Sequence, residues 1–153
     1  MTIILGSGSP SRKAVLTSMG FAFTVISPDI DEKTIRSDDP RELVSLIAQA
    51  KMDAVLQKVD SEAIVICSDQ VMVVGGKVRE KPSSKEEAYA FLSTFSTQPQ
   101  TATSCTVVCN TATGKRVSAI DEVTVNYGSR SPRACERVCR IWRSASLGWR
   151  PCG

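Results

Sequence analysis

The sequence predicts an α/β protein with a mixed, partly antiparallel sheet flanked by helices. In the first half of the chain, apolar β-branched segments alternate with patterns of helical spacing, which is typical of strands connected by helices. In the second half, apolar segments follow one another across turns, which predicts antiparallel hairpins. The length of 153 residues, with 42% hydrophobic and 23% charged residues, fits one globular domain.

The chain begins with a strand, a loop rich in glycine and serine, and a helix. The apolar segment at 2–5 predicts a buried strand, and the loop follows at 6–9. Ser9 is a suitable N-cap and Pro10 suits the first helical position, so we expect a helix over 11–19.

A second strand and a long amphipathic helix come next. Residues 21–26 are apolar and predict the strand. The sequence at 39–42, Asp-Pro-Arg-Glu, has the form of a capping box with proline at the first helical position. Apolar residues then recur at helical spacing to about Val59, so this helix is the clearest element of the sequence.

The later part of the chain is predicted to be mostly strand. The predicted elements are strands at 63–67 and 71–74, a helix at 84–95, and paired strands at 101–109 and 117–127. A turn at Gly75-Gly76 closes the first hairpin, and a turn at 111–114 closes the second.

Composition excludes several classes of protein. Histidine is absent, so imidazole cannot serve as a base or a metal ligand, and chemistry falls to carboxylates, amines, guanidinium, hydroxyl or thiol groups. No apolar run approaches the ~20 residues of a membrane-spanning helix. The start of the chain lacks the basic region of a signal peptide. We therefore expect a cytoplasmic protein with no membrane partner.

Residues 129–153 differ in kind from residues 1–128, and we place a boundary between them. The first segment carries 13 basic and 15 acidic residues, whereas the second carries six arginines, one acid and both tryptophans. Three interpretations compete: a nucleic-acid or membrane-surface binder, a poorly packed appendage, or an out-of-frame or alternatively spliced ending. We favour the third, because arginine, cysteine and tryptophan without lysine are typical of a frame change in GC-rich DNA.

The loop and helix start near the N-terminus predict an anion site. Loop N–H groups and the positive end of the helix dipole converge there, and Arg12 and Lys13 add formal charge. The loop is not a phosphate-binding P-loop, because the Gly-x4-Gly-Lys-Ser/Thr pattern is absent. The alternative is a capped helix with two solvated basic residues.

Acidic residues follow two of the predicted strands. Asp29, Asp31 and Glu32 come after the second strand, and Asp69 comes after the third. Acids beyond the ends of adjacent strands converge, and paired carboxylates bind Mg²⁺. Asp69 is the strongest candidate, because it interrupts an apolar stretch where an unpaired carboxylate is unfavourable. For Asp69 the alternative is a turn carboxylate, and for Asp29 and Asp31 a polar loop.

Lysine and cysteine residues give weaker indications. Lys51 falls within the long helix, where a solvated position is the simplest interpretation, and Lys81 is held extended by the following proline. Cys105 and Cys109 face the same side of a strand, but without Cys-x2-Cys spacing or histidine a zinc site is not expected. Buried free thiols are the expectation.

Five motifs occur in an order and spacing that is specific. They are ILGSGSPSRKAVL at 4–16, Asp31-Glu32, Ala50-Lys51, CSDQVMVVGGKVREKP at 67–82, and the helix at 84–95. Together they resemble the Maf family of nucleoside triphosphate pyrophosphatases, relatives of the inosine triphosphate pyrophosphatases. The resemblance covers residues 2–127 and implies that fold for segment 1–128. Family members continue with a further helix and strands, so the C-terminal part of the fold is expected to be incomplete.

The resemblance implies a role for each matching residue. It assigns phosphate binding to Ser7, Ser9, Arg12 and Lys13, further substrate binding to Lys51 and Lys81, catalysis to Asp69, and metal binding to Glu32 and Asp69. The implied metal is Mg²⁺, with Mn²⁺ as the alternative. Gln70 resembles the subgroup associated with 7-methylguanosine triphosphate, whereas threonine at this position typifies the subgroup favouring thymidine and uridine triphosphates.

The implied reaction is hydrolysis of a nucleoside triphosphate to the monophosphate and pyrophosphate, which would cleanse the nucleotide pool. The implied partners are the nucleotide and a second copy in a homodimer, and nucleic acid is not the expected partner. Two alternatives stay open: a truncated, inactive isoform that only binds nucleotide, and a nucleic-acid binder acting through its basic segment.

Overall fold

The computed structural model describes residues 1–79, 84–94 and 97–126. The chain divides into two compact units. The first consists of Met1–Val71 and Thr103–Glu122, and the second of Met72–Ala102 and Val123–Gly153. Segment 129–153 lies outside the described residues, so the predicted boundary at 128 stays a prediction.

Three strands at the start of the chain run parallel. β1 (Thr2–Leu5) pairs on one side with β2 (Thr24–Val25) and on the other with β3 (Ala63–Val74). In the β1–β3 register, Thr2 lies opposite Ala63 and Leu5 lies opposite Ile66. β3 therefore extends well past the carboxyl end of β1.

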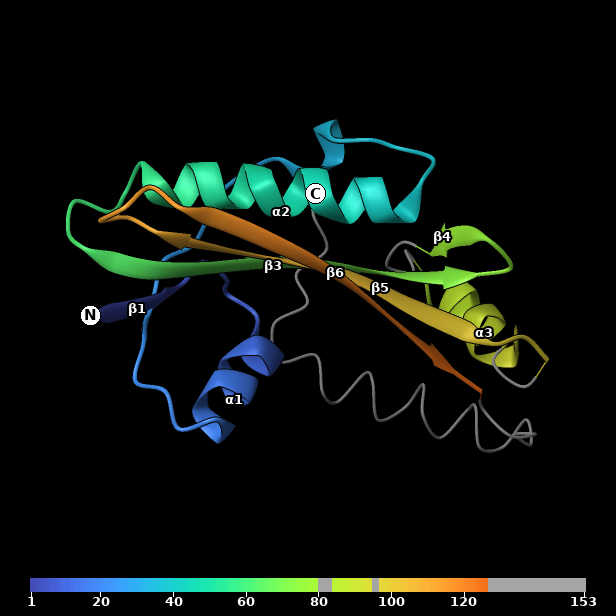
Figure 1. Cartoon of the computed structure of the whole chain (residues 1–153). Helices are drawn as coiled ribbons and strands as arrows, with labels where there is room; N and C mark the ends of the chain where they lie inside the picture. The colour runs from blue at the N-terminus through green and yellow to red at the C-terminus, as the bar shows by residue number, and fades with distance from the viewer. Residues whose placement is uncertain (80–83, 95–96, 127–153) are drawn as a thin grey trace. The chain divides into compact units, whose positions relative to one another are not determined.

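Two long strands complete the sheet, whose order is β2-β1-β3-β5-β6. β5 (Gln100–Asn110) and β6 (Arg116–Val125) form a hairpin closed by a hydrogen bond of 3.0 Å from the Asn110 nitrogen to the Lys115 carbonyl oxygen. β5 runs against β3, as the arrows in Figure 1 show. The mixed sheet with its antiparallel hairpin confirms the predicted fold class.

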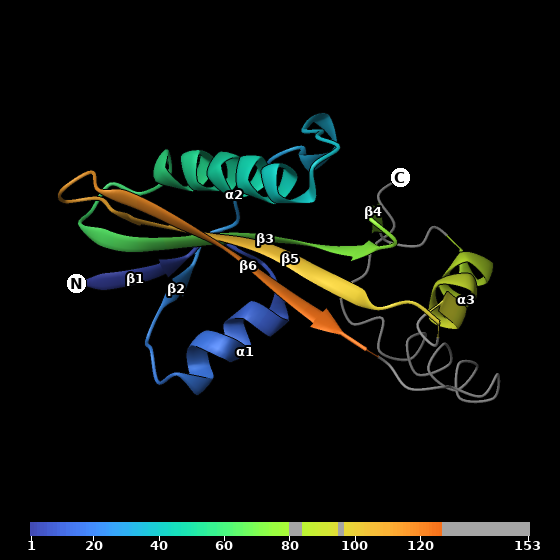
Figure 2. The same ribbon diagram turned by 45° about the vertical axis from the view of Figure 1, so that its right-hand side comes forward.

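Two helices cover opposite faces of the sheet in the first unit. α2 (Pro40–Leu56) lies on one face and α1 (Pro10–Ser18) on the other, as Figures 1 and 2 both show. Both helices have proline in the first turn, where its missing N–H group has no cost. α1 ends where Gly20 takes a φ of +79°, as expected of a helix-ending glycine.

The predicted caps differ in detail. Asp39 accepts a hydrogen bond of 2.9 Å from the Arg41 nitrogen, but the Glu42 carboxylate binds the Ser37 hydroxyl at 2.6 Å and does not return to Asp39. In a capping box the glutamate would accept a hydrogen bond from the Asp39 nitrogen. Here Ser37 Oγ accepts that hydrogen bond instead, at 3.1 Å. At α1, Ser9 holds the N-cap position, but its side chain accepts no capping hydrogen bond from a main-chain N–H group of the helix.

The core of the first unit lies between α2 and the sheet. None of its buried members exposes more than 5% of its surface. They are Ile4, Val44, Ala48, Met52, Val55, Ala63, Val65, Cys67, Cys105, Val107 and Cys109. Fully burying an aliphatic side chain contributes about 1.5–3 kcal/mol. This packing fixes the register between α2 and β3.

Gly6 is required where the N-terminal loop meets this core. A Cβ atom at this position would overlap Cys67 Sγ and approach Val55 Cγ2 to 2.9 Å. The Gly6 nitrogen donates to the Ile66 carbonyl oxygen at 2.8 Å, which holds the loop against β3. No side chain can therefore replace this hydrogen atom without moving the loop.

The second unit contains a short hairpin and a helix. β4 (Lys77–Arg79) pairs antiparallel with the end of β3, and the turn glycines Gly75 and Gly76 have φ values of +58° and +76°. The predicted turn is confirmed. α3 (Lys85–Thr94) begins after Ser84, whose Oγ accepts from the Glu87 nitrogen at 3.1 Å.

Two strand predictions were wrong in extent. The predicted strand at 21–26 is reduced to Thr24–Val25, because only Ile4 and Leu5 of β1 offer it partners. The separate strands at 63–67 and 71–74 are one strand, β3. Asp69 does not interrupt it, because a lysine from α2 pairs with this carboxylate inside the protein.

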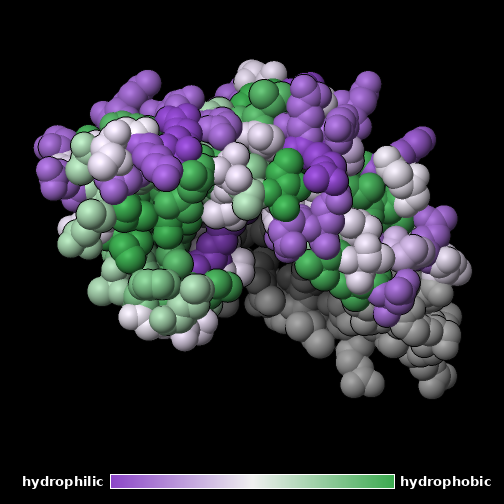
Figure 3. Space-filling model, in the orientation of Figure 1, coloured by the Kyte–Doolittle hydropathy of each residue, from purple (hydrophilic) through white to green (hydrophobic). Residues whose placement is uncertain are grey.

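The surface mixes polar and apolar side chains. In β6 every residue is exposed, including Val117 at 54% and Val123 at 52%. Hydrophobic patches among hydrophilic ones are visible on the face drawn in Figure 3. In the described part of the chain, no helix is long and apolar enough to cross a membrane.

Candidate active site

Asp69 is a buried carboxylate at the centre of the first unit. It is 6% exposed and has the same strand parity as Val65 and Cys67, so it points toward α2. It lies three residues beyond Ile66, the last residue of β3 that pairs with β1. The expectation that Asp69 follows a strand is therefore wrong, although it does lie beyond the end of the parallel pairing.

Lys51 supplies the partner that this carboxylate needs. It lies on α2, is 5% exposed, and its Nζ donates to Asp69 Oδ1 at 2.7 Å. The same Nζ forms an ion pair of 2.9 Å with Glu32 Oε1. The solvated position considered for Lys51 is thus wrong, because the register of α2 on β3 points its side chain into the protein.

Glu32 approaches from the loop after β2. It begins the short 3-10 helix η1 (Glu32–Thr34), and its side chain is 52% exposed. Asp31 is the N-cap of η1, since its Oδ1 accepts from the Lys33 nitrogen at 3.1 Å. Of the acidic residues after β2, Glu32 alone reaches Lys51 in the described structure.

Asp29 lies elsewhere in the same loop. Its Oδ2 accepts a hydrogen bond of 2.6 Å from Lys58, and hydrogen bonds from Lys58 and Ser27 hold the pKa of this carboxyl below its usual value. The structure thus separates Asp29 and Asp31 from Asp69, in agreement with the polar-loop alternative for those two residues.

The two carboxylates suit a hard divalent cation. Asp69 and Glu32 each place one oxygen within ion-pair distance of the Lys51 ammonium group, so the two carboxylates lie near each other. The described residues hold no group of three or more acidic or thiol side chains placed as a metal site. Mg²⁺ commonly takes one or two carboxylates and completes its shell with water and substrate phosphates. The residues present fit that pattern.

The glycine- and serine-rich loop precedes α1, where main-chain N–H groups are free of helical partners. Ser7 is 5% exposed, and its Oγ accepts from Arg12 Nη1 and from the Ser9 nitrogen, both at 3.2 Å. Ser9 Oγ lies 2.9 Å from Ser11 Oγ. This hydrogen bond holds the Arg12 guanidinium against the loop. Lys13 follows Arg12 in the first turn of α1.

Cys67 connects this loop with the carboxylate cluster. Burial raises the pKa of its thiol to about 11, and the positive charges of Lys51, Arg116 and Arg12 oppose that rise. Lys51 and Arg12 therefore both act on one sulfur atom, which also touches the position of a Cβ at Gly6. Gly6 of the loop therefore packs directly against Cys67, which lies two residues before Asp69 on β3.

Of the two remaining predicted substrate residues, Gln70 is not brought into this cluster. Gln70 is exposed and follows Asp69 on β3, so its side chain points to the opposite face of the sheet. Lys81 lies outside the described residues.

The predicted free thiols are confirmed. Cys105 and Cys109 are buried and unpaired on one side of β5, as is Cys67 on β3. Burial raises the pKa of Cys105, a hydrogen bond from Ser45 opposes the rise, and the charge of Asp69 adds to it. Cys105 belongs to the same core cluster as Cys67, which its position in the sequence alone did not indicate.

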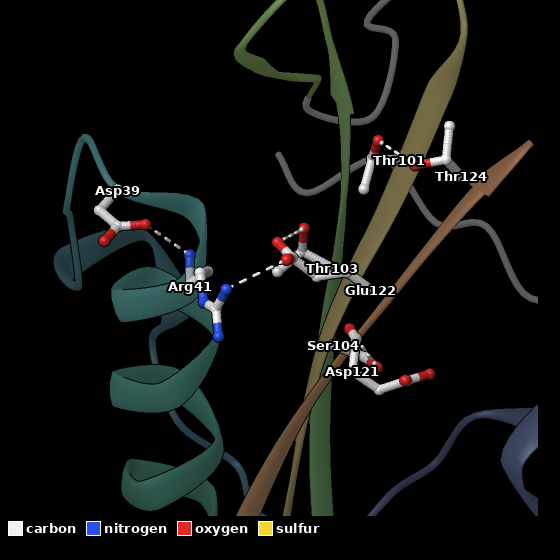
Figure 4. Close-up of polar contacts among 8 residues, drawn as sticks. All are labelled: Asp39, Arg41, Thr101, Thr103, Ser104, Asp121, Glu122 and Thr124. Carbon is white, nitrogen blue, oxygen red and sulfur yellow. Dashed lines mark hydrogen bonds and ion pairs between the residues drawn. The ribbon is translucent and has the colours of Figure 1, made fainter.

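Polar contacts also join α2 to the neighbouring strands. Near the start of α2, Arg41 Nη1 binds Glu122 Oε2 at 3.2 Å, and Thr103 Oγ1 donates to Glu122 Oε1 at 3.2 Å, as Figure 4 shows. Farther along α2, Arg116 Nη2 binds Asp53 Oδ1 at 2.7 Å.

Two solved structures share the fold. The Staphylococcus aureus Ham1 protein superposes with a TM-score of 0.54 over 86% of this chain and 77% of its own, at 13% identity. A nucleoside-triphosphatase / dITP/XTP pyrophosphatase of Mycobacterium abscessus superposes with a TM-score of 0.51 over 97% of this chain and 100% of its own, at 12% identity. The chain thus has the α/β fold of these proteins.

The family model described as Maf-like protein matches residues 2–146, and the chain belongs to this family. A 7-methyl-GTP pyrophosphatase of Dictyostelium discoideum is 39% identical over 145 residues, which cover 90% of this chain and 74% of that protein. A dTTP/UTP pyrophosphatase of Chlamydia caviae is 37% identical over 97 residues, which cover 63% of this chain and 50% of that protein.

Proposed function

We propose that this protein hydrolyses nucleoside triphosphates to the monophosphate and pyrophosphate. The observation that carries the proposal is that the carboxylates of Asp69 and Glu32 both pair with the buried ammonium group of Lys51. The loop before α1 packs through Gly6 against Cys67, two residues before Asp69 on β3, which supports a role for this loop beside the cluster. Family membership supports the proposal, because relatives in this family carry the names of nucleotide pyrophosphatases.

The phosphate chain would bind at the loop before α1. The first main-chain N–H groups of a helix have no helical partners, and the helix dipole there favours negative charge. Arg12 already lies over Ser7 and needs only to exchange the Ser7 hydroxyl for a phosphate oxygen, while Lys13 adds a second positive charge. These groups would offset charge that develops on the phosphates during the reaction.

Asp69 and Glu32 would hold a divalent cation, Mg²⁺ or Mn²⁺. When bound, such a cation lowers the pKa of a coordinated water and neutralises phosphate charge. Asp69 would orient the attacking water and accept its proton, because it is the more buried of the two carboxylates. Lys51 would hold both carboxylates in place.

For the nucleobase we propose 7-methylguanosine triphosphate, with dTTP and UTP as the competing substrates. Gln70 in the Ser-Asp-Gln sequence resembles the first subgroup. The Dictyostelium relative is named a 7-methyl-GTP pyrophosphatase, and the Chlamydia caviae relative a dTTP/UTP pyrophosphatase. A panel of the three nucleotides at equal concentration, compared by kcat/KM, distinguishes these substrates.

The activity is tested by product analysis. With Mg²⁺ present we expect equal amounts of nucleoside monophosphate and pyrophosphate, and no reaction after chelation with EDTA. Release of orthophosphate and nucleoside diphosphate would contradict cleavage between the α and β phosphates. Full activity in EDTA would contradict the role of the two carboxylates.

Location and assembly complete the proposal. The family resemblance supports a cytoplasmic homodimer that cleanses the nucleotide pool, and light scattering of the purified full chain tests the dimer. The second candidate function, nucleotide binding without turnover, predicts calorimetric binding of the triphosphate in Mg²⁺ with no pyrophosphate produced.

A further inference from the structure

Lys58 forms a contact that the reaction proposed above does not use. It lies just after α2, where its main-chain nitrogen donates to the Val55 carbonyl oxygen at 2.9 Å. Its Nζ donates to the Ser27 carbonyl oxygen at 2.9 Å and to Asp29 Oδ2 at 2.6 Å. One ammonium group thus binds two points in the loop that connects β2 with Glu32.

Lys51 lies on α2, and Lys58 lies two residues after Leu56, the last residue of that helix. Lys58 binds the beginning of the loop at Ser27 and Asp29, and Lys51 binds its end at Glu32 Oε1. The segment that carries the acidic residue is therefore attached at one end to α2 and at the other to the turn that follows α2. This helix also packs on β3, which carries Asp69.

The loop conformation between these two points is unfavourable by itself. Asp29 has a φ of +47°, in the left-handed region that residues with a Cβ rarely adopt. Conformations of this kind persist where surrounding contacts determine them, and they concentrate at functional sites. Lys58 binds the Ser27 carbonyl oxygen just before this residue and the side chain of Asp29 itself, so its two hydrogen bonds are contacts that help to determine this conformation.

We propose that Lys58, through Asp29, is a positioning residue that places Glu32 opposite Asp69 for metal binding. The inference rests on the proposed function, because it concerns the carboxylate pair assigned there to the cation. Without Lys58 the loop loses its first attachment, Asp29 relaxes from its left-handed conformation, and Glu32 moves relative to Lys51 and Asp69.

A positioning role differs from a role in global stability. The Lys58 and Asp29 side chains are 41% and 69% exposed, and exposed ion pairs contribute little to the stability of the whole protein. Loss of Lys58 is therefore expected to loosen the loop and weaken metal binding while the fold persists. Arg116 provides a matched control, since it forms an exposed ion pair of 2.7 Å with Asp53 of α2, away from this loop.

The experiment compares Lys58→Met with Arg116→Met and the parent full-length chain by hydrogen exchange. Peptides covering 27–35 are expected to exchange at least about threefold faster in Lys58→Met, because local opening there becomes easier. The same peptides in Arg116→Met are expected to match the parent. Unchanged exchange in Lys58→Met would overturn the proposal.

Metal affinity is measured on the same variants by electron paramagnetic resonance with Mn²⁺ alone, which requires no turnover. Lys58→Met is expected to bind Mn²⁺ about threefold to tenfold more weakly, and Lys58→Arg, which keeps two donors, is expected to regain most of the loss. Faster exchange with unchanged Mn²⁺ affinity would overturn the positioning role. A parent chain that binds Mn²⁺ but hydrolyses no nucleotide would contradict the proposed function and leave this inference standing.

Discussion

Asp69 and Lys51 are buried because each satisfies the charge of the other. They are 6% and 5% exposed, and 2.7 Å separates Asp69 Oδ1 from Lys51 Nζ. A buried ion pair commonly gives no net gain in stability over apolar side chains of the same size, because both charges lose their hydration. The presence of this ion pair is therefore better explained by a functional role of the two charged groups than by a contribution to the stability of the core.

Removing one member of this pair should destabilise the protein strongly. Lys51→Met leaves the Asp69 carboxylate buried without its cation, and we expect a loss of about 3–5 kcal/mol in the free energy of unfolding. Adding Asp69→Asn to Lys51→Met should restore part of that loss, since the unpaired charge disappears. Urea denaturation of the single and double variants gives both values.

Arg41→Met is the control for Lys51→Met. The Arg41 and Glu122 side chains are 58% and 39% exposed, so losing their ion pair should change the free energy of unfolding by about 1 kcal/mol or less. Equal losses in Lys51→Met and Arg41→Met would show that the Lys51 charge is not buried in solution.

Cys67 predicts a dependence of stability on alkaline pH. Burial raises the pKa of its thiol from 9.0 to about 11, so the folded protein holds this proton more tightly than the unfolded chain. The resulting stability is fully present below pH 9, declines as pH rises, and is lost through pH 11. In Cys67→Ala, the urea midpoint should fall less between pH 8 and pH 10.5 than in the parent. Parallel declines in the two proteins would contradict the raised pKa.

At the scale of single residues, the sequence identified Asp69 but not the position of Lys51. A carboxylate in an apolar stretch needs a partner whatever the fold, so Asp69 stands out without a structure. The side chain of Lys51 meets Asp69 only because α2 packs on β3 in one particular register, and no local pattern encodes that register. The same holds for Lys58 and Asp29, which are 29 residues apart.

At the scale of the elements, the turn from β1 into α1 is closely packed at Gly6. Gly6→Ala would force a methyl group onto Cys67 Sγ and Val55 Cγ2, and we expect a loss of about 1–3 kcal/mol in the free energy of unfolding. Gly8→Ala is the matched control in the same loop, because a Cβ there meets nothing within 4 Å. Thermal melts of both variants make the comparison, and similar midpoints for the two would contradict the close packing at Gly6.

Helices and turns were predicted more accurately than strand limits. α1 and α2 follow proline at the first helical position, and Gly75-Gly76 closes a hairpin as predicted, because each signal is local. Strand limits depend on partners elsewhere in the chain. The segment at 21–26 keeps two strand residues because β1 is short, and β3 continues through Asp69 because α2 provides a cation.

For the whole chain, the open structural question is segment 129–153. Its three aliphatic residues, Val138, Ile141 and Leu147, are separated by arginines, and burying two of them contributes roughly 3–6 kcal/mol before conformational entropy is subtracted. We therefore expect a chain ending at residue 128 to melt no lower than the full chain. A clear drop in the midpoint would show that the segment packs as part of the fold, in keeping with the family match to residue 146.

The central claim is that the cluster around Lys51 hydrolyses nucleoside triphosphates. The most direct measurement is pyrophosphate release by Asp69→Asn and the parent full-length chain at saturating Mg²⁺. We expect the parent to release pyrophosphate and Asp69→Asn to lose at least ~100-fold in kcat with an unchanged circular dichroism spectrum, because the substitution removes the charge and keeps the volume. Activity of Asp69→Asn near that of the parent would place the reaction elsewhere in the protein.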